Sequence, residues 1–348
     1  MGRLDAPIRP EPEMEPGFAV TLRGSGRSFS AGPQDTLLAA ALRAGLDLPA
    51  DCKSGFCGAC RLRVISGAVA HPEDLPGLDP AEIAGGAALA CQARALGPLV
   101  IEAEPHSPDL SPPVTMTARV LRRTDPVPGI TRLWLGLSGA PAIAAGQYVN
   151  ILLEDGAQRP FSVAAITPEG IELQIRALPG GRFTDRILPG LAAGDALRLE
   201  LPRGVFRYRP GDFRPLVLAA TGTGIAPLAA ILAELAAAPE EAPPVALYWG
   251  MRSEADLYLL DDLARLGAGL DDFALVPVLS RGGPDWPGRR GHVQAAVLAD
   301  FPSLEDHALY LCGNPGMIAT ARRMFLAAGA SVNHLYTDSF LAAAASPA

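Results

Sequence analysis

Residues 51–60 read DCKSGFCGAC, and a related cysteine, Cys91, follows further along the chain. Cys52, Cys57 and Cys60 have the spacing C-x4-C-x2-C. This spacing, completed by a distant fourth cysteine, is the plant-type pattern in which four thiolates bind a [2Fe–2S] cluster. The sequence therefore predicts an iron–sulfur cluster held by Cys52, Cys57, Cys60 and Cys91.

Two other metal centres also use cysteine ligands. Structural zinc also takes four cysteines, but it favours paired C-x2-C motifs. A Rieske centre requires two histidine ligands, whereas His71 is the only histidine nearby and we expect it at the surface. Gly55 and Gly58 favour the cluster, because their backbone N–H groups can approach the sulfur atoms and tune its potential.

The composition of the chain excludes several classes of function. A formal net charge of −8 over 348 residues gives no basic surface for nucleic acid or for an anionic membrane. Five cysteines, an odd number, argue against a disulfide framework. The N-terminal stretch has prolines and glutamates where a signal peptide is apolar, and glycines interrupt the uncharged run 215–233. We therefore expect a cytoplasmic protein without membrane insertion or nucleic-acid binding.

Changes of pattern along the chain predict separate domains. The first part combines a hairpin at Phe18–Phe29 with a helix that Asp35 and Thr36 cap. A proline-rich stretch without apolar periodicity then predicts a linker. Short alternating segments predict an antiparallel β-barrel, and the last part alternates apolar strands with helices, as in a doubly wound parallel sheet. The expected boundaries are a disordered tail at 1–16, the cysteine domain at 17–104, the linker at 105–113, the barrel at 114–211 and the α/β domain at 212–348.

The expected helices of the α/β domain alternate with its apolar strands. They are Pro227–Ala238, Glu254–Leu266, Val293–Ala299 and Pro315–Ala328.

The barrel segment carries a motif suited to a flavin. Arg159–Ser162 reads RPFS, and we place it at the end of a strand. Arg159 can neutralise a pyrophosphate, Phe161 offers an apolar ring, and Ser162 has a hydroxyl for the N5 region of a flavin. Gly180 and Gly181 precede an expected short helix whose N–H groups suit an anion. In the alternative interpretation, Arg159 is a surface charge and Phe161 is a core residue. We favour the flavin because the RPFS motif and the Gly180–Gly181 motif follow one another along the same segment.

Two motifs in the α/β domain follow apolar strands. Residues 221–227 read TGTGIAP, and a strand, a glycine turn and a helix that opens at Pro227 form a phosphate-binding corner. Residues 311–317 read LCGNPGM and place Cys312 at the same edge of the sheet. A lone cysteine is normally a small buried hydrophobe, but the surrounding glycines and proline favour a site.

Over residues 17–342 the chain resembles the NADH-dependent iron–sulfur flavoprotein reductases of bacterial multicomponent oxygenases, such as those of methane monooxygenase, phenol hydroxylase and benzoate dioxygenase. The resemblance implies an α+β β-grasp ferredoxin domain, an FAD-binding antiparallel β-barrel and an α/β nucleotide-binding domain. It also implies that hydride passes from NADH to FAD, and that single electrons then pass through the cluster to a docked protein. That acceptor is expected to be a terminal oxygenase or hydroxylase component.

The resemblance further implies a role for each matching residue. Phe161 stands where the family usually has a tyrosine, which removes a hydroxyl but keeps the stacking face. Catalytic roles fall to Ser162, Cys312 and Phe340, the last within a C-terminal Asp338–Phe340 segment. The cofactor-binding residues are Arg159, Phe161, Ser162, Gly180, Gly181, Thr184, Gly222, Thr223, Gly224, Pro227, Arg252, Gly313 and Pro315.

The residues that follow the second and third strands of the α/β domain are expected to reach the adenosine ribose, where NADH and NADPH differ. Arg281, with Arg289 and Arg290 downstream, could bind a 2′-phosphate. Glu254 or Asp256 would repel that phosphate, so the sequence favours NADH.

Two other functions share parts of this pattern. The same electron chain could serve a non-oxygenase acceptor, such as a sugar dehydratase of the deoxysugar type. A non-catalytic redox regulator is a second alternative, and the intact motifs around Cys312 and Gly222 argue against it.

Overall fold

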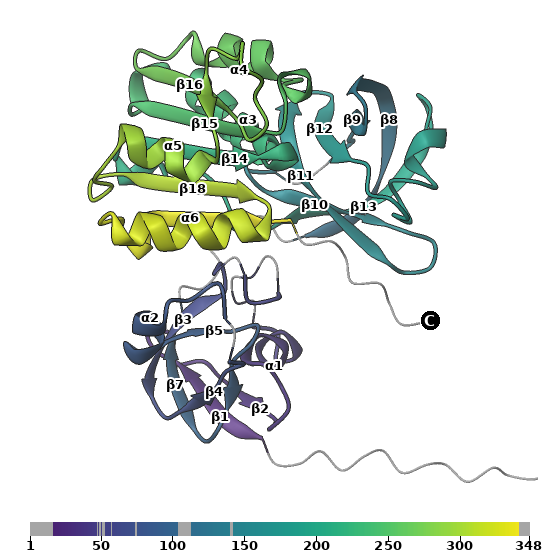
Figure 1. The fold of residues 1–348 in the computed structure, drawn as a ribbon. Helices are drawn as coiled ribbons and strands as arrows, with labels where there is room; N and C mark the ends of the chain where they lie inside the picture. Colours follow the sequence, from purple (N-terminus) through teal and green to yellow (C-terminus); the bar gives the residue numbers. More distant parts are fainter. Residues whose placement is uncertain are drawn as a thin grey trace, which may run out of the picture. The chain divides into compact units, whose positions relative to one another are not determined.

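The structure divides the chain into two compact units (Figure 1). It is a computed structural model that describes residues 17–46, 48, 50, 53–56, 58–73, 75–103, 113–139 and 142–340. One unit comprises Met1–Leu48 and Cys60–Pro105, and the other comprises Pro49–Ala59 and His106–Ala348. The expected tail, and the expected linker apart from Pro113, lie outside the described residues.

The first unit is built on a five-stranded sheet in the order β2-β1-β7-β3-β5. β1 pairs with β2 as the expected antiparallel hairpin and with β7 in parallel. The helix α1 packs its buried face, which includes Leu37 and Ala41, onto this unit's core. The elements are β1 (Phe18–Leu22), β2 (Ser28–Ala31), α1 (Leu37–Arg43), β3 (Arg61–Ser66), β4 (Val69–Ala70), α2 (Pro80–Ala84), β5 (Ala87–Leu89), β6 (Arg94–Ala95) and β7 (Leu99–Glu102).

The start of α1 differs from the expectation in one respect. Thr36 is the N-cap, and its hydroxyl accepts the N–H of Ala39 over 3.2 Å. Asp35 does not cap the helix. Its carboxylate accepts the N–H of Gly32 over 2.8 Å and forms an ion pair with Arg43, whose hydrogen bond lowers the pKa of Asp35.

The second unit begins with a closed antiparallel barrel in the order β10-β11-β12-β9-β8-β13. Alternating side chains such as Leu133, Val163 and Leu173 fill its interior and are fully buried. The longest strand, β8, was not expected, because its outward face is polar and its apolar positions are sparse. The strands are β8 (Val114–Val127), β9 (Ile130–Gly136), β10 (Tyr148–Leu152), β11 (Gln158–Thr167), β12 (Gly170–Arg176) and β13 (Ala196–Arg203), and η1 (Leu188–Gly190) is a 3-10 turn.

A parallel sheet in the order β17-β16-β15-β14-β18-β19 completes the second unit. α3 and α4 belong to the core on one face of the sheet, and α5 and α6 belong to the core on the other. The chain leaves β14 toward β15 on one side and returns at β18 on the other, which makes the β14/β18 gap the topological switch point. The elements are β14 (Leu216–Thr221), α3 (Ile225–Ala237), β15 (Val245–Met251), α4 (Leu260–Gly267), β16 (Phe273–Leu279), β17 (Arg289–Arg290), α5 (Val293–Asp300), β18 (Ala308–Gly313), α6 (Pro315–Ala327) and β19 (Leu335–Ser339).

Two expected helix starts are displaced. α3 begins at Ile225, directly after a 3-10 turn (η3, Gly222–Gly224), so Pro227 lies inside its first turn. The expected helix from Glu254 begins instead with a separate 3-10 turn (η5, Glu254–Asp256), and α4 starts at Leu260. Among the described residues, no helix is long and apolar enough to cross a membrane.

Candidate functional site

The glycine turn after β14 lies directly against the end of β18. A Cβ atom at Gly224 would overlap the carbonyl group of Cys312, and one at Gly313 would overlap the hydroxyl oxygen of Thr221. The same Thr221 hydroxyl accepts the N–H of Asn314 over 3.2 Å. These close approaches require glycine at both positions, and they join the two motifs of the α/β domain at the switch point.

One carboxylate brings the barrel and the parallel sheet together at this point. The hydroxyl of Ser162, on β11, donates to Oδ2 of Asp338, on β19, over 3.3 Å. The Sγ atom of Cys312, on β18, lies 3.8 Å from the same oxygen. All three side chains are buried. We call Ser162, Cys312 and Asp338 the Asp338 junction.

Phe340 follows this junction along the chain. Its backbone N–H donates to the carbonyl oxygen of Gly313 over 3.0 Å. Its side chain is partly buried and packs against the core on the α3 face. The structure therefore brings Phe340 to the same edge as Cys312.

The RPFS motif opens strand β11, whereas we expected it to end a strand. The ring of Phe161 lies 5.5 Å from the ring of Phe183 and packs against the barrel core, yet it stays partly exposed. Arg159 is also partly exposed, and its guanidinium donates to the carbonyl oxygen of Gln158 over 2.8 Å. A cation, an apolar ring and a hydroxyl therefore lie along one strand.

The segment that follows Gly181, after β12, forms turns and not the expected short helix. Gly180 lies in one turn and residues 182–187 form the next, and only η1 beyond them is helical. The N–H of Gly180 already donates to the carboxylate of Asp185 over 2.6 Å. The hydroxyl of Thr184 is bonded to both the N–H and the carbonyl oxygen of Leu178. In this structure, Gly180 and Thr184 stabilise the loop itself.

A surface pocket of about 600 Å³ lies beyond the carboxyl ends of β15 and β16. Glu254, Arg281, Asp285 and Trp286 are among the residues that line it. Asp256 is not among them: its carboxylate accepts the N–H and the hydroxyl of Ser253 in the capping box of η5.

Three arginines near this pocket have different surroundings. Arg289 forms an ion pair with Asp300. Arg290 donates to the carbonyl oxygens of Gly283, Pro284 and Trp286, each over 2.8 Å. Arg252 is exposed. Two of the arginines considered for a 2′-phosphate are therefore engaged elsewhere.

Of the four expected cluster ligands, the structure describes two, and Cys52 and Cys57 lie outside the described residues. Cys60 directly precedes β3 and Cys91 follows β5, and both are buried. Their Sγ atoms are 3.2 Å apart, well beyond the length of a disulfide bond. Two buried sulfur atoms at this distance fit ligands of one iron–sulfur cluster.

Two glycines of the cysteine loop, and the nearby His71, have distinctive surroundings. Gly55 and Gly58 both have left-handed φ angles, +82° and +76°, which favour glycine at these positions. His71 is half-buried rather than at the surface, and its Nε2 atom makes no hydrogen bond with the described residues. Burial lowers the pKa of His71.

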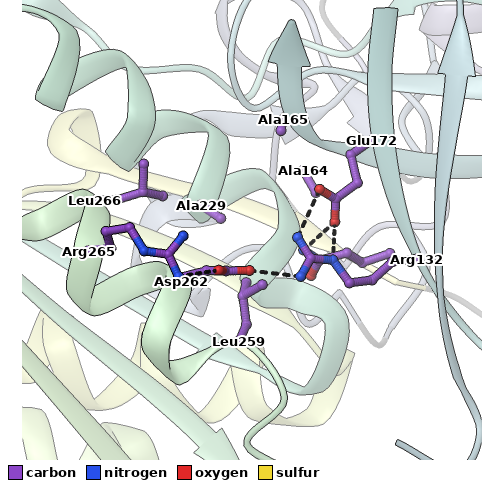
Figure 2. Close-up of a pocket in the computed structure, with 10 residues that line it drawn as sticks. Arg132, Ala164, Ala165, Glu172, Ala229, Leu259, Asp262, Arg265 and Leu266 are labelled. Carbon is purple, nitrogen blue, oxygen red and sulfur yellow. Dashed lines mark hydrogen bonds and ion pairs between the residues drawn. The ribbon is translucent and has the colours of Figure 1, made fainter. Parts of the chain in front are cut away.

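Sequence reasoning missed a polar joint between the barrel and the parallel sheet (Figure 2). Arg132, on β9, forms a bidentate pair with Glu172, on β12, and a further pair with Asp262, on α4. Gln174, also on β12, accepts the hydroxyl of Tyr258 over 2.8 Å. Because side chains alternate along a strand, Glu172 and Gln174 share one face of β12, but alternation does not show that α4 and Tyr258 cover that face.

Comparisons with known proteins agree with this architecture. Residues 20–96 match the 2Fe-2S iron-sulfur cluster binding domain, and residues 218–323 match the oxidoreductase NAD-binding domain. The chain is 38% identical to the reductase subunit of an aromatic O-demethylase from Amycolatopsis, over 93% of this chain and 98% of the relative.

Further relatives match over nearly their whole length. Reductase component 2 of terephthalate 1,2-dioxygenase from Comamonas is 31% identical, over 92% of this chain and 96% of the relative. A CDP-6-deoxy-L-threo-D-glycero-4-hexulose-3-dehydrase reductase from Yersinia pestis is 32% identical, over 92% of this chain and 98% of the relative. The crystal structure of an Amycolatopsis cytochrome P450 reductase superposes with a TM-score of 0.70 at 38% identity and covers 93% of this chain and 98% of that chain.

The residues of the barrel fit the flavin that these comparisons imply. Arg159 supplies a cation for a pyrophosphate, Phe161 a partly exposed ring, and Ser162 a buried hydroxyl beside the sheet edge. The buried pair Cys60 and Cys91 fits the iron–sulfur cluster in the same way. The chain therefore belongs to the family of NAD(P)H-dependent iron–sulfur flavoprotein reductases, electron-transfer enzymes that pass electrons from NAD(P)H through FAD to a [2Fe–2S] cluster.

Proposed function

We propose that this chain takes electrons from NADH and delivers them one at a time to a terminal oxygenase or hydroxylase component. The observation that carries the proposal is the Asp338 junction, where Ser162 of the barrel and Cys312 of the sheet edge meet at one carboxylate oxygen of Asp338. FAD, when bound, accepts two electrons as hydride and releases them singly. A two-electron donor can thereby serve a one-electron acceptor.

The residues of the junction have distinct roles in this proposal. Ser162 and Cys312 flank the reacting atoms of flavin and nicotinamide, and Asp338 orients both side chains through its Oδ2 atom. Phe340 covers the flavin ring when no nicotinamide is bound. Because the three junction side chains are buried, they exclude water and hold their geometry before the coenzyme arrives.

The remaining site residues bind the two nucleotides. We assign the flavin to Arg159, Phe161 and Ser162, with the Gly180–Thr184 loop shaping the pyrophosphate end. We assign the coenzyme phosphates to the η3 turn and the start of α3, and the nicotinamide end to the loop after Cys312. The coenzyme residues are Gly222, Thr223, Gly224, Pro227, Arg252, Gly313 and Pro315.

The choice of NADH over NADPH rests on the pocket beyond β15 and β16. Arg281 lines it together with the carboxylates of Glu254 and Asp285, whereas Arg289 and Arg290 are bonded elsewhere. A ribose 2′-hydroxyl can donate to a carboxylate, but a 2′-phosphate would be repelled. We expect kcat/KM with ferricyanide to be at least about tenfold higher for NADH than for NADPH. An equal or reversed preference would contradict this assignment.

The oxygenase partner is supported by the relatives. The names of two of them refer to an aromatic O-demethylase and a dioxygenase, and a third name refers to a deoxysugar dehydrase. The dehydrase system is therefore the alternative acceptor. We also propose that the domains join through residues 105–113 and that the protein is cytoplasmic, where its nicotinamide donor is regenerated.

The partner is tested by purifying the full chain together with the products of its neighbouring genes. We expect NADH-dependent oxygen uptake that requires both the chain and an oxygenase component. Electron transfer to a sugar dehydrase without oxygen uptake would support the alternative acceptor. Failure of the purified chain to oxidise NADH with ferricyanide would instead indicate a non-catalytic regulator.

A further inference from the structure

The pocket drawn in Figure 2 lies where α3 and α4 meet the barrel strands β9, β11 and β12, and its volume is about 280 Å³. Its charged side chains pair with one another. Arg132 bonds to Glu172 and Asp262, and Arg265 bonds to the other oxygen of Asp262 over 3.0 Å. Because these charges are already neutralised, the pocket has the character of a joint between two domains and not of an ionic ligand site.

The geometry of this joint is specific. Two nitrogen atoms of Arg132 donate to Glu172, over 2.6 and 3.0 Å. The third nitrogen atom donates to Asp262 over 2.7 Å. The side chain of Glu172 is only 5% exposed, and that of Arg132 is 20% exposed. A bidentate guanidinium pair in such partial burial fixes both distance and angle. We call Arg132, Glu172 and Asp262 the Arg132 bridge.

A continuous series of contacts runs from the Arg132 bridge to the nucleotide loop. Gln174 donates to Glu172 over 3.2 Å and accepts the hydroxyl of Tyr258. The ring of Tyr258 meets the ring of Trp249 edge to face, with centroids 5.4 Å apart. Trp249 is fully buried, and its indole N–H donates to the carbonyl oxygen of Gly222 over 3.0 Å.

The burial of Tyr258 supports a fixed contact. Its hydroxyl end is buried, which raises its pKa, while the remainder of the side chain keeps some exposure. A buried phenol that donates to an amide oxygen has one favoured orientation. The ring is therefore held against Trp249, which in turn holds the first glycine of the η3 turn.

We propose that Arg132 and Asp262 are positioning residues that set the NAD-binding domain at a fixed angle on the FAD barrel, and that Tyr258 and Trp249 extend this constraint to the Gly222–Gly224 turn. This inference rests on the proposed function, because the quantity it controls is the alignment of nicotinamide and flavin. Alignment matters strongly: a misplacement of about 1 Å can cost about 100-fold in rate.

The test compares Asp262→Asn with Asp261→Asn. Both substitutions remove one negative charge from the first turn of α4, but Asp261 is exposed and lies outside the Arg132 bridge. Anaerobic stopped-flow mixing with NADH and with NADH deuterated at C4 gives the limiting rate of flavin reduction and the apparent Kd. We expect Asp262→Asn to lower the limiting rate about tenfold, with a Kd within about twofold, and Asp261→Asn to leave both unchanged.

A second readout does not depend on the reaction. Hydrogen–deuterium exchange of the peptide spanning residues 218–228 is expected to be faster in Asp262→Asn and unchanged in Asp261→Asn, with or without bound cofactors. Asp262→Glu keeps the carboxylate and is expected to restore most of the rate. Tyr258→Phe keeps the ring against Trp249 and is expected to show a smaller loss of the same kind.

The proposal is overturned if Asp262→Asn reduces its flavin at the wild-type rate, or if Asp261→Asn slows it equally. A lower Tm with an unchanged rate would also overturn it, since that result describes a purely structural joint. Failure of the wild-type protein itself to accept electrons from NADH would contradict the proposed function, while the exchange experiment would still decide whether the Arg132 bridge constrains the turn.

Discussion

The hydroxyl of Ser162 donates to Asp338 across 3.3 Å, although the two residues are 176 positions apart in the chain. Ser162 belongs to the barrel and Asp338 to the edge strand β19 of the parallel sheet. Cys312, on the neighbouring strand, approaches the same oxygen. These contacts join the barrel to the parallel sheet, at the point where we propose that hydride crosses from coenzyme to flavin.

Removal of the Cys312 thiol tests whether that side chain serves the reaction. We expect Cys312→Ala to slow flavin reduction by NADH about tenfold while changing the Kd for NADH less than about threefold. The lost buried sulfur atom should cost only about 1 kcal/mol of stability. Stopped-flow reduction at several NADH concentrations separates the two constants. An unchanged reduction rate would make Cys312 an ordinary core residue.

The contact between Ser162 and Asp338 is tested by a double-mutant cycle. Ser162→Ala and Asp338→Asn are each expected to slow flavin reduction, and the double variant should lose less than the sum because both changes break one contact. We expect a coupling energy of about 1 kcal/mol in the activation free energy. Flavin content per chain is the control. Strictly additive losses would show that the two side chains act independently.

The sequence predicts the motifs of the site better than it predicts the contacts between the barrel and the parallel sheet. Cys312 and Gly313 end an apolar strand, the Gly222–Gly224 turn follows another, and the parallel sheet brings such strand ends together. Asp338 was visible only through a family resemblance, because a single aspartate near the end of a strand has no local signature. Its role depends on a partner, Ser162, that lies in another domain.

The Arg132 bridge shows the same limit more sharply. The alternation of side chains along β12 places Glu172 and Gln174 on one face, but polar residues on a strand are usually exposed to solvent. Here α4 and Tyr258 cover them, and burial becomes possible only because Arg132 supplies the opposite charge. Tertiary packing of this kind cannot be inferred from the local sequence.

The cysteine assignments predict that the two redox centres can be separated. Cys57→Ser is expected to remove the iron–sulfur EPR signal and to leave bound flavin and NADH–ferricyanide activity near the wild-type level. The reason is that the cysteine motif lies within residues 20–96, which match the 2Fe-2S iron-sulfur cluster binding domain, whereas the flavin motif lies on strand β11 of the barrel. Metal analysis and flavin release after denaturation provide the measurements. Loss of flavin in this variant would contradict the separation.

Burial of His71 predicts a pH dependence of the ferredoxin domain's stability. Because burial lowers the folded pKa below 6.5, the unfolded state binds the proton first as the pH falls. The contribution of His71 to the free energy of unfolding is therefore fully present above pH 6.5. It is lost as the pH falls from that value through the lower pKa of the folded state. The hydrogen bond with Arg43 lowers the pKa of Asp35 from 3.8, so the titration of Asp35 lies well below the pH range in which His71 changes its charge.

The measurement is the temperature at which the cluster absorbance is lost, in wild type and His71→Gln, at about pH 7.5 and about pH 5.5. We expect the wild type to lose more thermal stability on acidification than the variant does. Equal pH dependence in both proteins would mean that His71 is as accessible when folded as when unfolded.

The most direct test of the electron path is anaerobic mixing of the full-length protein with NADH, followed by optical and rapid-freeze EPR detection. Flavin bleaching should come first, and the reduced [2Fe–2S] signal should then grow at the expense of reduced flavin. In Cys57→Ser only the first phase should remain. Reduction of the cluster before the flavin, or at an unchanged rate in protein stripped of flavin, would contradict the path from NADH through FAD to the cluster.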